Sequence, residues 1–228
     1  MNPSRLVAAA LGAVTLVTGP LAAQAALTQV RGRLTVLEAA NRSASDVGQA
    51  VVWLATTRPV PVTPDTISVI TTDKEFRPRT VVVPVGSYVR FPNSDPFNHN
   101  VFSRSDAAIF DLGLYGRGDV RGKALTRAGL VNVYCNVHAR MSAFVVVRDN
   151  PYFTQPSADG SFTIAGVPPG RYTLYAWHER AKEPVTEEIV VPRGGLSGLG
   201  VRLDARGYEW EPHLDKFGKP YEQRRRRY

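Results

Sequence analysis

Four residues whose side chains can bind a metal ion lie in two short stretches of the sequence. Cys135, His138 and Met141 follow one another with the spacing C-x2-H-x2-M, and His99 lies upstream in the run Phe-Asn-His-Asn. Cys135 is the only cysteine, and Met141 is the only methionine apart from Met1. One thiolate, two imidazoles and one thioether form the ligand set of a blue-copper electron-transfer site. The sequence therefore predicts a site for one copper ion of this type, held by these four residues.

Each of these residues also has an ordinary structural role. A lone cysteine is commonly a small buried hydrophobe, and a methionine commonly fills a gap in the core. The joint occurrence of Cys135, His138 and Met141 in one loop, with a matching histidine upstream, favours a metal site over these separate roles. Zinc could use the same side chains, but zinc sites prefer cysteine and histidine to a thioether.

The residue after the first histidine is expected to support the site. Asn100 directly follows His99, and we expect its side chain to bond across to the backbone near Cys135 and so brace the two loops. Hydrogen bonds behind metal ligands orient them and tune the metal. The alternative is that Asn100 caps a turn.

The elements that must position these residues are predicted to be strands. Short runs rich in Val, Thr, Tyr and Phe alternate with turn residues, among them 17 prolines and 19 glycines in 228 residues. This pattern predicts an all-β protein. Residues 65–148 contain about seven such runs, enough for a Greek-key sandwich, and Cys135 ends the run 129–134. Residues 105–122 carry four glycines and little periodicity, so we expect an irregular excursion there.

Residues 66–148 contain the motifs Phe76-x-Pro78, Val83-x-Val85-Gly86-x-x-Val89-x-Phe91-x-Asn93, His99-Asn100-Val101 and Cys135-x-x-His138-x-x-Met141. Together these motifs resemble the plastocyanin/amicyanin type of cupredoxin. The runs Phe91-Pro92-Asn93-Ser94-Asp95 and Cys135-Asn136-Val137-His138 also resemble bacterial methylamine-utilisation or plastocyanin-like proteins. The resemblance implies a cupredoxin sandwich with a mononuclear copper site; the lack of a proline before His138 and the long connection 113–122 depart from it.

The flanking segments contain the runs Gly32-Arg33-Leu34-Thr35-Val36 and Gln49-Ala50-Val51-Val52-Trp53-Leu54 on one side and residues 159–162 and 167–174 on the other. They resemble the two halves of another β-sandwich, the carboxypeptidase-regulatory-like (transthyretin-like) domain. The runs Asp-Gly-Ser-Phe at 159–162 and Val-Pro-Pro-Gly-Arg-Tyr-Thr-Leu at 167–174 carry the second half. The strands predicted near 32–36 and 50–54 look like the first half. Neither half can bury a core alone, so we expect a discontinuous domain, 28–57 plus 152–203, with the cupredoxin domain 65–148 inserted. This hypothesis requires the strand 50–56 to pair within the second half.

The two ends of the chain suggest export and a basic surface. Residues 1–25 have the charge, apolar run and small-residue cleavage motif of a secretory signal, which predicts a periplasmic or secreted protein with no stable membrane span after cleavage. Residues 204–228 form a polar basic tail that we expect to lie on the surface or be disordered. The net charge of +8 favours redox partners with an acidic docking surface. The arginines 224–227 could bind anionic lipid or nucleic acid, but a solubilising end is preferred, and no nucleic-acid partner is expected.

Three functions are compatible with these observations. The first is an exported protein that carries single electrons between redox partners. The second is copper storage or delivery without redox turnover, and the third is a metal-free scaffold or docking module. An enzyme is not expected, because no second histidine cluster is present for a second metal. His178 is predicted to be an ordinary polar residue ending a strand, and His213 to lie on the surface of the tail.

Overall fold

The computed structural model describes residues 28–39 and 42–221 and confirms the all-β class. The described residues form seventeen strands and one short 3-10 helix, η2 (Val47–Gln49). None of the helices among them is long and apolar enough to cross a membrane. The predicted secretory signal and the arginines 224–227 lie outside the described residues.

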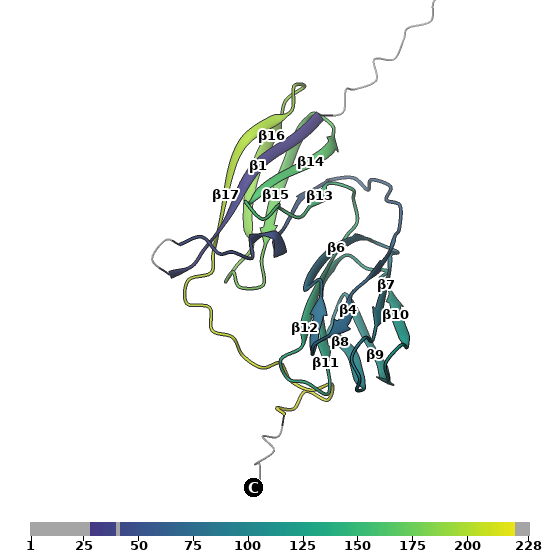
Figure 1. Ribbon diagram of the computed structural model, residues 1–228. Coiled ribbons are helices and arrows are strands. Elements are labelled where there is room, and N and C mark those ends of the chain that lie inside the picture. The colour runs from purple at the N-terminus through teal and green to yellow at the C-terminus, as the bar shows by residue number, and fades with distance from the viewer. Residues whose placement is uncertain (1–27, 40–41, 222–228) are drawn as a thin grey trace, which may run out of the picture.

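Two sheets form the first unit, here called the host sandwich (Figure 1). In both sheets, strands from the N-terminal segment lie beside strands from the second half of the chain. The three-stranded sheet has the order β14 (Ser161–Val167), β1 (Thr28–Leu37), β17 (Leu196–Asp204). The four-stranded sheet has the order β13 (Phe153–Thr154), β2 (Val51–Ala55), β15 (Gly170–Trp177), β16 (Val185–Val191).

The N-terminal segment completes the host sandwich by giving one strand to each sheet. Strand β1 pairs antiparallel with β14 and parallel with β17, and β2 pairs antiparallel with β15. Val52, for example, lies opposite Ala176, so the strand predicted at 50–56 pairs within the second half of the sandwich, as the insertion hypothesis requires. Leu34, Leu54 and Leu174 are 0–1% exposed in one shared core. Since the two halves pack into one core, neither half is a separate folding unit.

Ten strands between the two halves form the second unit, here called the site unit, which has its own hydrophobic core. Its larger sheet has the order β6 (Thr80–Pro84), β12 (Ser142–Arg148), β11 (Gly129–Cys135), β8 (His99–Ser105), β9 (Ala108–Tyr115). The smaller sheet has the order β10 (Val120–Ala124), β7 (Tyr88–Pro92), β3 (Thr66–Ser68). Strands β4 (Ile70–Thr72) and β5 (Glu75–Arg77) form a hairpin.

The expectation of an irregular excursion over residues 105–122 was wrong, because strands β9 and β10 lie there. Strand β9 is at the edge of the larger sheet, and Ile109 on it is 71% exposed. Its pairing with β8 shifts register between Asn100 and Phe102, and Gly113 has a φ of 71°. An edge strand with exposed apolar residues and an irregular register lacks a clean period of two, which is why the pattern missed it.

The chain leaves and re-enters the host sandwich at adjacent points. The amide of Leu54 donates to the carbonyl of Tyr152 at 2.8 Å. The side chain of Asn150 donates back to the carbonyl of Leu54 at 3.1 Å. These bonds close the base of the site unit, so its two connections run side by side, as an insertion requires.

The two units also touch near the start of β12. The guanidinium of Arg79 contacts the carboxylate of Glu179 through three nitrogen–oxygen pairs of 2.7 to 2.9 Å. The rings of Phe144 and Trp177 lie 5.4 Å apart between centroids. The host sandwich therefore packs against the end of the site unit that follows Met141.

Candidate metal centre

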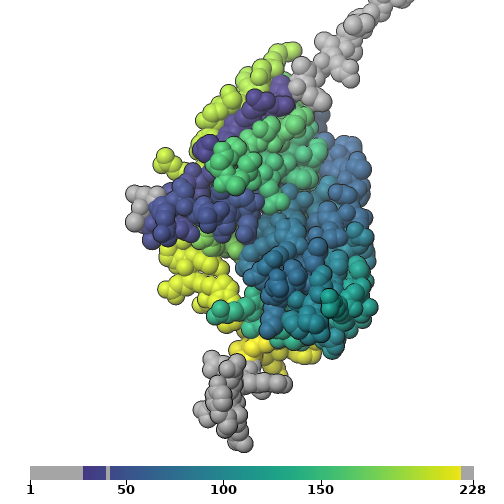
Figure 2. Space-filling view, viewed as in Figure 1, coloured from purple at the N-terminus to yellow at the C-terminus, as the bar shows by residue number. Residues whose placement is uncertain are grey.

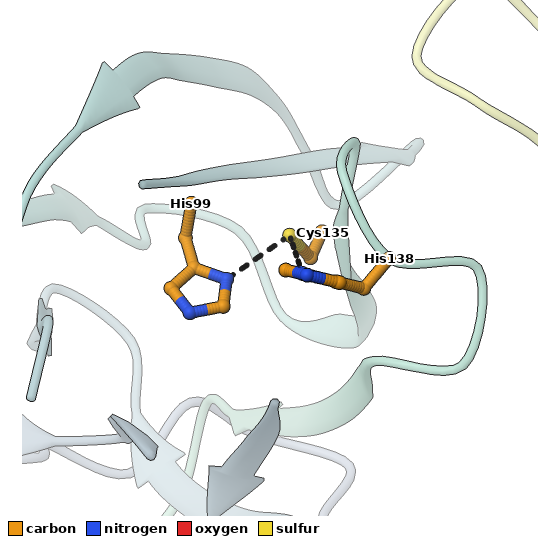
Figure 3. A group of neighbouring side chains, drawn as sticks. All are labelled: His99, Cys135 and His138. Carbon is orange, nitrogen blue, oxygen red and sulfur yellow. Dashed lines mark hydrogen bonds between the residues drawn. The ribbon is translucent and has the colours of Figure 1, made fainter. Parts of the chain in front are cut away.

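Three of the four predicted ligands meet at one end of the site unit (Figure 3). His99 begins β8 and Cys135 ends β11; these strands are antiparallel neighbours, with Cys135 opposite Val101. His138 comes from residues 136–141, here called the ligand loop, which joins β11 to β12. Antiparallel pairing puts the start of one strand beside the end of the next, and this brings together residues 36 positions apart.

The distances between these side chains suit a small metal ion. Nδ1 of His99 lies 3.4 Å from Sγ of Cys135, and Nδ1 of His138 lies 3.7 Å from the same sulfur. Metal–ligand bonds of about 2.0–2.3 Å place neighbouring ligand atoms roughly 3.5 Å apart. His99 and Cys135 are fully buried and His138 is half-buried, so an ion here would be shielded on most sides.

An acidic residue that the sequence analysis missed selects the tautomer of the first histidine. The carboxylate of Asp95 accepts a hydrogen bond from Nε2 of His99 at 2.8 Å. Because Nε2 carries the proton, the lone pair of Nδ1 faces the Cys135 sulfur and is free for a metal. Asp95 is itself held by the backbone amides of Asp73, at 2.7 Å, and Lys74, at 3.0 Å. The sequence signal that could have revealed this contact is the position of Asp95, a carboxylate four residues before the candidate ligand His99.

The protonation of the other two ligands follows from burial. Burial raises the pKa of the Cys135 thiol, although the backbone amides of Asn100, Val137 and His138 oppose this by stabilising the thiolate. Burial also lowers the pKa of His138, and the nearby His99 acts in the same direction. A metal ion would therefore meet a neutral imidazole and would have to displace the thiol proton.

Met141 closes the ligand loop from within. It is 1% exposed and belongs to the core cluster that contains Cys135. Its amide donates to the carbonyl of His138 at 3.1 Å, and its carbonyl accepts from the amide of Cys135 at 3.2 Å. These two bonds make the loop a tight turn of fixed shape between two strands.

The prediction that the Asn100 side chain bonds to the backbone near Cys135 was wrong. The amide nitrogen of this side chain donates to the carboxylate of Asp111 on β9 rather than to the backbone near Cys135. The backbone of Asn100 does the bracing instead, since its carbonyl accepts from the amide of Asn136 at 2.8 Å. The charged acceptor on the neighbouring strand makes the stronger hydrogen bond, and it draws the side chain away from the loop.

The two remaining histidines of the described chain differ from their expected settings. His178 follows strand β15 as predicted, but it is fully buried, and its Nε2 has no hydrogen-bond partner among the described residues. His213 is half-buried, and its ring stacks on Tyr134 at 4.4 Å between centroids. Packing against distant segments, which local sequence does not reveal, accounts for both differences.

Comparisons with known proteins give partial matches. Residues 116–195 match the family model "Polysaccharide lyase family 4, domain II", about a third of the chain, beginning in the site unit and ending in the host sandwich. No curated protein matches the sequence.

Among solved structures, similar chains include three copper proteins or cupredoxins. A copper-containing nitrite reductase from Thermus scotoductus SA-01 is 23% identical with a TM-score of 0.35, over 40% of this chain and only 25% of its own. A purple cupredoxin from Nitrosopumilus maritimus is 22% identical with a TM-score of 0.32, over 36% of this chain and 98% of its own. Amicyanin from Paracoccus versutus is 19% identical with a TM-score of 0.34, over 42% and 97%. These scores are low, so the case for a metal rests on the side chains of this protein.

Proposed function

We propose that this protein binds one copper ion in a cupredoxin-like type-1 site and carries single electrons between redox partners. One observation carries the proposal: an imidazole nitrogen of the buried His99 and one of the half-buried His138 flank the buried Cys135 sulfur at 3.4 and 3.7 Å. The proton of His99 is held on its far nitrogen by Asp95, which supports a ligand role for the near one. Met141 is the candidate fourth ligand.

The residues around the site suit an electron carrier more than a reaction centre. Bound copper would supply reversible one-electron chemistry. The chain holds His99 and Cys135 at strand ends and His138 in a loop closed by two backbone hydrogen bonds. Such a frame limits rearrangement of the ligands between oxidation states, which favours rapid electron transfer. We therefore propose a carrier and not an enzyme.

The surface beside His138 is the proposed docking site for redox partners. Val137 is 46% exposed at the tip of the ligand loop. A hollow of about 520 Å³ borders the loop; three basic residues, Lys74, Arg79 and Arg140, and two acidic residues, Asp73 and Glu75, contribute to its lining. An apolar tip beside basic side chains suits a partner with acidic groups, and association should weaken as salt is added.

We also propose an exported location and a supporting role for the host sandwich. A single cysteine cannot form an internal disulfide in an oxidising compartment, and a metal ligand role would keep it occupied. The host sandwich resembles a carboxypeptidase-regulatory-like domain in its sequence motifs. Its contact through Glu179 and Arg79 lies beside the ligand loop, which supports a role in presenting the copper edge to partners.

The test is the visible absorption spectrum of purified metal-free protein titrated with Cu(II). We expect an intense blue or green thiolate-to-copper band at one equivalent, lost in Cys135→Ser and in His99→Asn. His178→Gln is the matched control, because it alters a buried histidine outside the site and should leave the band unchanged.

Two other outcomes would identify the alternatives. Weak, exchangeable copper without an intense band would indicate storage or delivery. Folded protein that takes up no copper would rule out the proposal and leave a metal-free scaffold.

A further inference from the structure

The C-terminal segment that follows the host sandwich ends on the ligand loop. After β17 the chain crosses to the site unit, and in Figure 2 its last described part lies along the lower edge of that unit. Residues 208–221 of this segment are here called the strap. These residues are exposed or half-buried, as expected of a surface tail, and in addition side chains of the strap contact the loop that carries His138.

The first contact is made by His213. Its ring stacks on Tyr134, the residue before Cys135, with centroids 4.4 Å apart and planes inclined by 21°. Its Nε2 lies 3.3 Å from the carbonyl oxygen of His138. One strap residue therefore touches both the end of β11 and the middle of the ligand loop.

Two further contacts involve the backbone of the loop and the strand beside it. The hydroxyl of Tyr221 donates to the carbonyl of Cys135 at 2.8 Å, and the amide of Lys216 donates to the side-chain oxygen of Asn136 at 2.9 Å. The ammonium of Lys216 also pairs with Asp111 at 2.6 Å, the carboxylate that accepts from Asn100. The strap thus joins the ligand loop to β9, whose Asp111 in turn accepts from Asn100 on β8, the residue after His99.

The strap has local structure of its own. The carboxylate of Asp215 accepts from the amides of Phe217, at 2.9 Å, and Lys219, at 2.8 Å, and its own amide donates to the carbonyl of Lys219 at 2.8 Å. These bonds form a closed turn between His213 and Tyr221. Earlier in the strap, the Trp210 ring lies 4.8 Å from the guanidinium of Arg140. A segment with a built turn is pre-organised for its contacts and loses little entropy in making them.

We propose that the strap is an integral outer wall of the metal centre, in which Tyr221 and His213 are positioning residues that hold the ligand loop in shape before any metal binds. The contacts of the strap with the ligand loop do not depend on the function proposed above; only the presence of a metal in the centre rests on it. The physical reason is that the loop is short and half-exposed on its outer side, where its carbonyls would otherwise face water. The Tyr221 hydroxyl satisfies the carbonyl of Cys135, and the His213 ring packs against Tyr134 and lies beside the carbonyl of His138. Together these contacts limit the fluctuations of the loop.

The first test is amide hydrogen exchange in the full-length, metal-free protein. The amides of Cys135, Asn136 and Met141 are hydrogen-bonded within the site and report its opening. Tyr221→Phe removes one hydroxyl and should speed their exchange about fivefold, the effect of a single hydrogen bond. Adding His213→Ala should raise this above tenfold.

The control for this test is Tyr88→Phe, which removes a hydroxyl from a tyrosine that is 41% exposed on β7. It should leave the three amides unchanged, and amides of β15 in the host sandwich should exchange equally in every variant. Unchanged exchange at the three site amides in the double variant would overturn the proposal. Equal acceleration in β15 would also overturn it, because the effect would then be global destabilisation.

A second readout uses Cu(II) itself. In the loaded protein, transfer of Cu(II) to excess EDTA should be faster in Tyr221→Phe than in the parent and in Tyr88→Phe, and the visible band should shift as the loop relaxes. Equal transfer rates and identical spectra would argue against positioning of the ligands by the strap. If the parent takes up no copper, the proposed function fails, while the exchange result still decides whether the strap holds the loop.

Discussion

Nε2 of His99 lies 2.8 Å from Oδ2 of Asp95, on the side of the ring opposite the Cys135 sulfur. Asp95 is 5% exposed and also accepts from the backbone amides of Asp73 and Lys74. The carboxylate therefore joins the β4–β5 hairpin to the first candidate ligand. Because three donors converge on it, its replacement should affect both folding and metal binding.

Asp95→Asn is predicted to destabilise the metal-free protein by about 1–3 kcal/mol, since the amide cannot accept all three hydrogen bonds. It should also weaken Cu(II) binding by about 10–100-fold, because the orientation and tautomer of His99 are no longer imposed. Chemical denaturation and a competitive Cu(II) titration measure the two effects. Asp106→Asn changes an exposed carboxylate and is the control. Equal Cu(II) affinity in Asp95→Asn and the parent would contradict this role.

Substitution of Met141 separates packing from metal ligation. Met141→Leu conserves volume and should cost less than about 1.5 kcal/mol, whereas Met141→Ala should cost about 2–5 kcal/mol by leaving a cavity. In the copper-loaded protein, Met141→Leu should retain the thiolate band but change the reduction potential, because the axial ligand tunes it. Voltammetry and spectroscopy of the folded variant measure these. An unchanged potential would make Met141 a core residue only.

The ion pair between Arg79 and Glu179 is predicted to hold the two units together. The Glu179 side chain is 8% exposed, and Arg79 also donates to the hydroxyl of Ser142 at 2.9 Å. A double-mutant cycle with Arg79→Met and Glu179→Gln should give a coupling energy of about 2 kcal/mol in unfolding experiments. The exposed pair of Arg77 with Glu75 should give less than about 1 kcal/mol. Similar values for both pairs would rule out a special role for the contact between units.

The buried His178 should make stability depend on pH. Burial lowers its pKa, and Arg180 acts in the same direction, while Asp46, 3.7 Å away, and Glu179 oppose the shift. A lowered pKa in the folded state means that the unfolded state binds the proton more readily. Stability is therefore complete above about pH 6.5, the unfolded value, and falls as the pH drops toward the folded pKa.

We expect the free energy of unfolding to fall between pH 7.5 and 5.5, by at most about 1.4 kcal/mol per pH unit from this group. His178→Gln should reduce that slope, which urea unfolding at a series of pH values will measure. A variant with the slope of the parent would show that other groups cause the dependence.

Local sequence determined much of the all-β architecture. The strand predicted at 50–56 is β2, since a short apolar run bounded by turn residues marks a buried strand well. The edge strand β9 escaped notice because its exposed face and its bulge remove a clear alternation of apolar and polar residues. A strand can be predicted from sequence when its apolar side chains are the buried ones; backbone pairing alone, as in β9, leaves no such pattern in the sequence.

Along the sequence, the spacing of Cys135, His138 and Met141 determined one candidate loop, because residues a few positions apart in a short turn cannot lie far from one another. Only the tertiary structure decided which side chains surround that loop. The amides of Asp73 and Lys74 against Asp95, and Tyr221 against the carbonyl of Cys135, are contacts between separate segments. The latter spans 86 positions and depends on how the host sandwich directs the chain after β17. Such contacts follow from the packing of whole sheets, and local spacing carries no information about them.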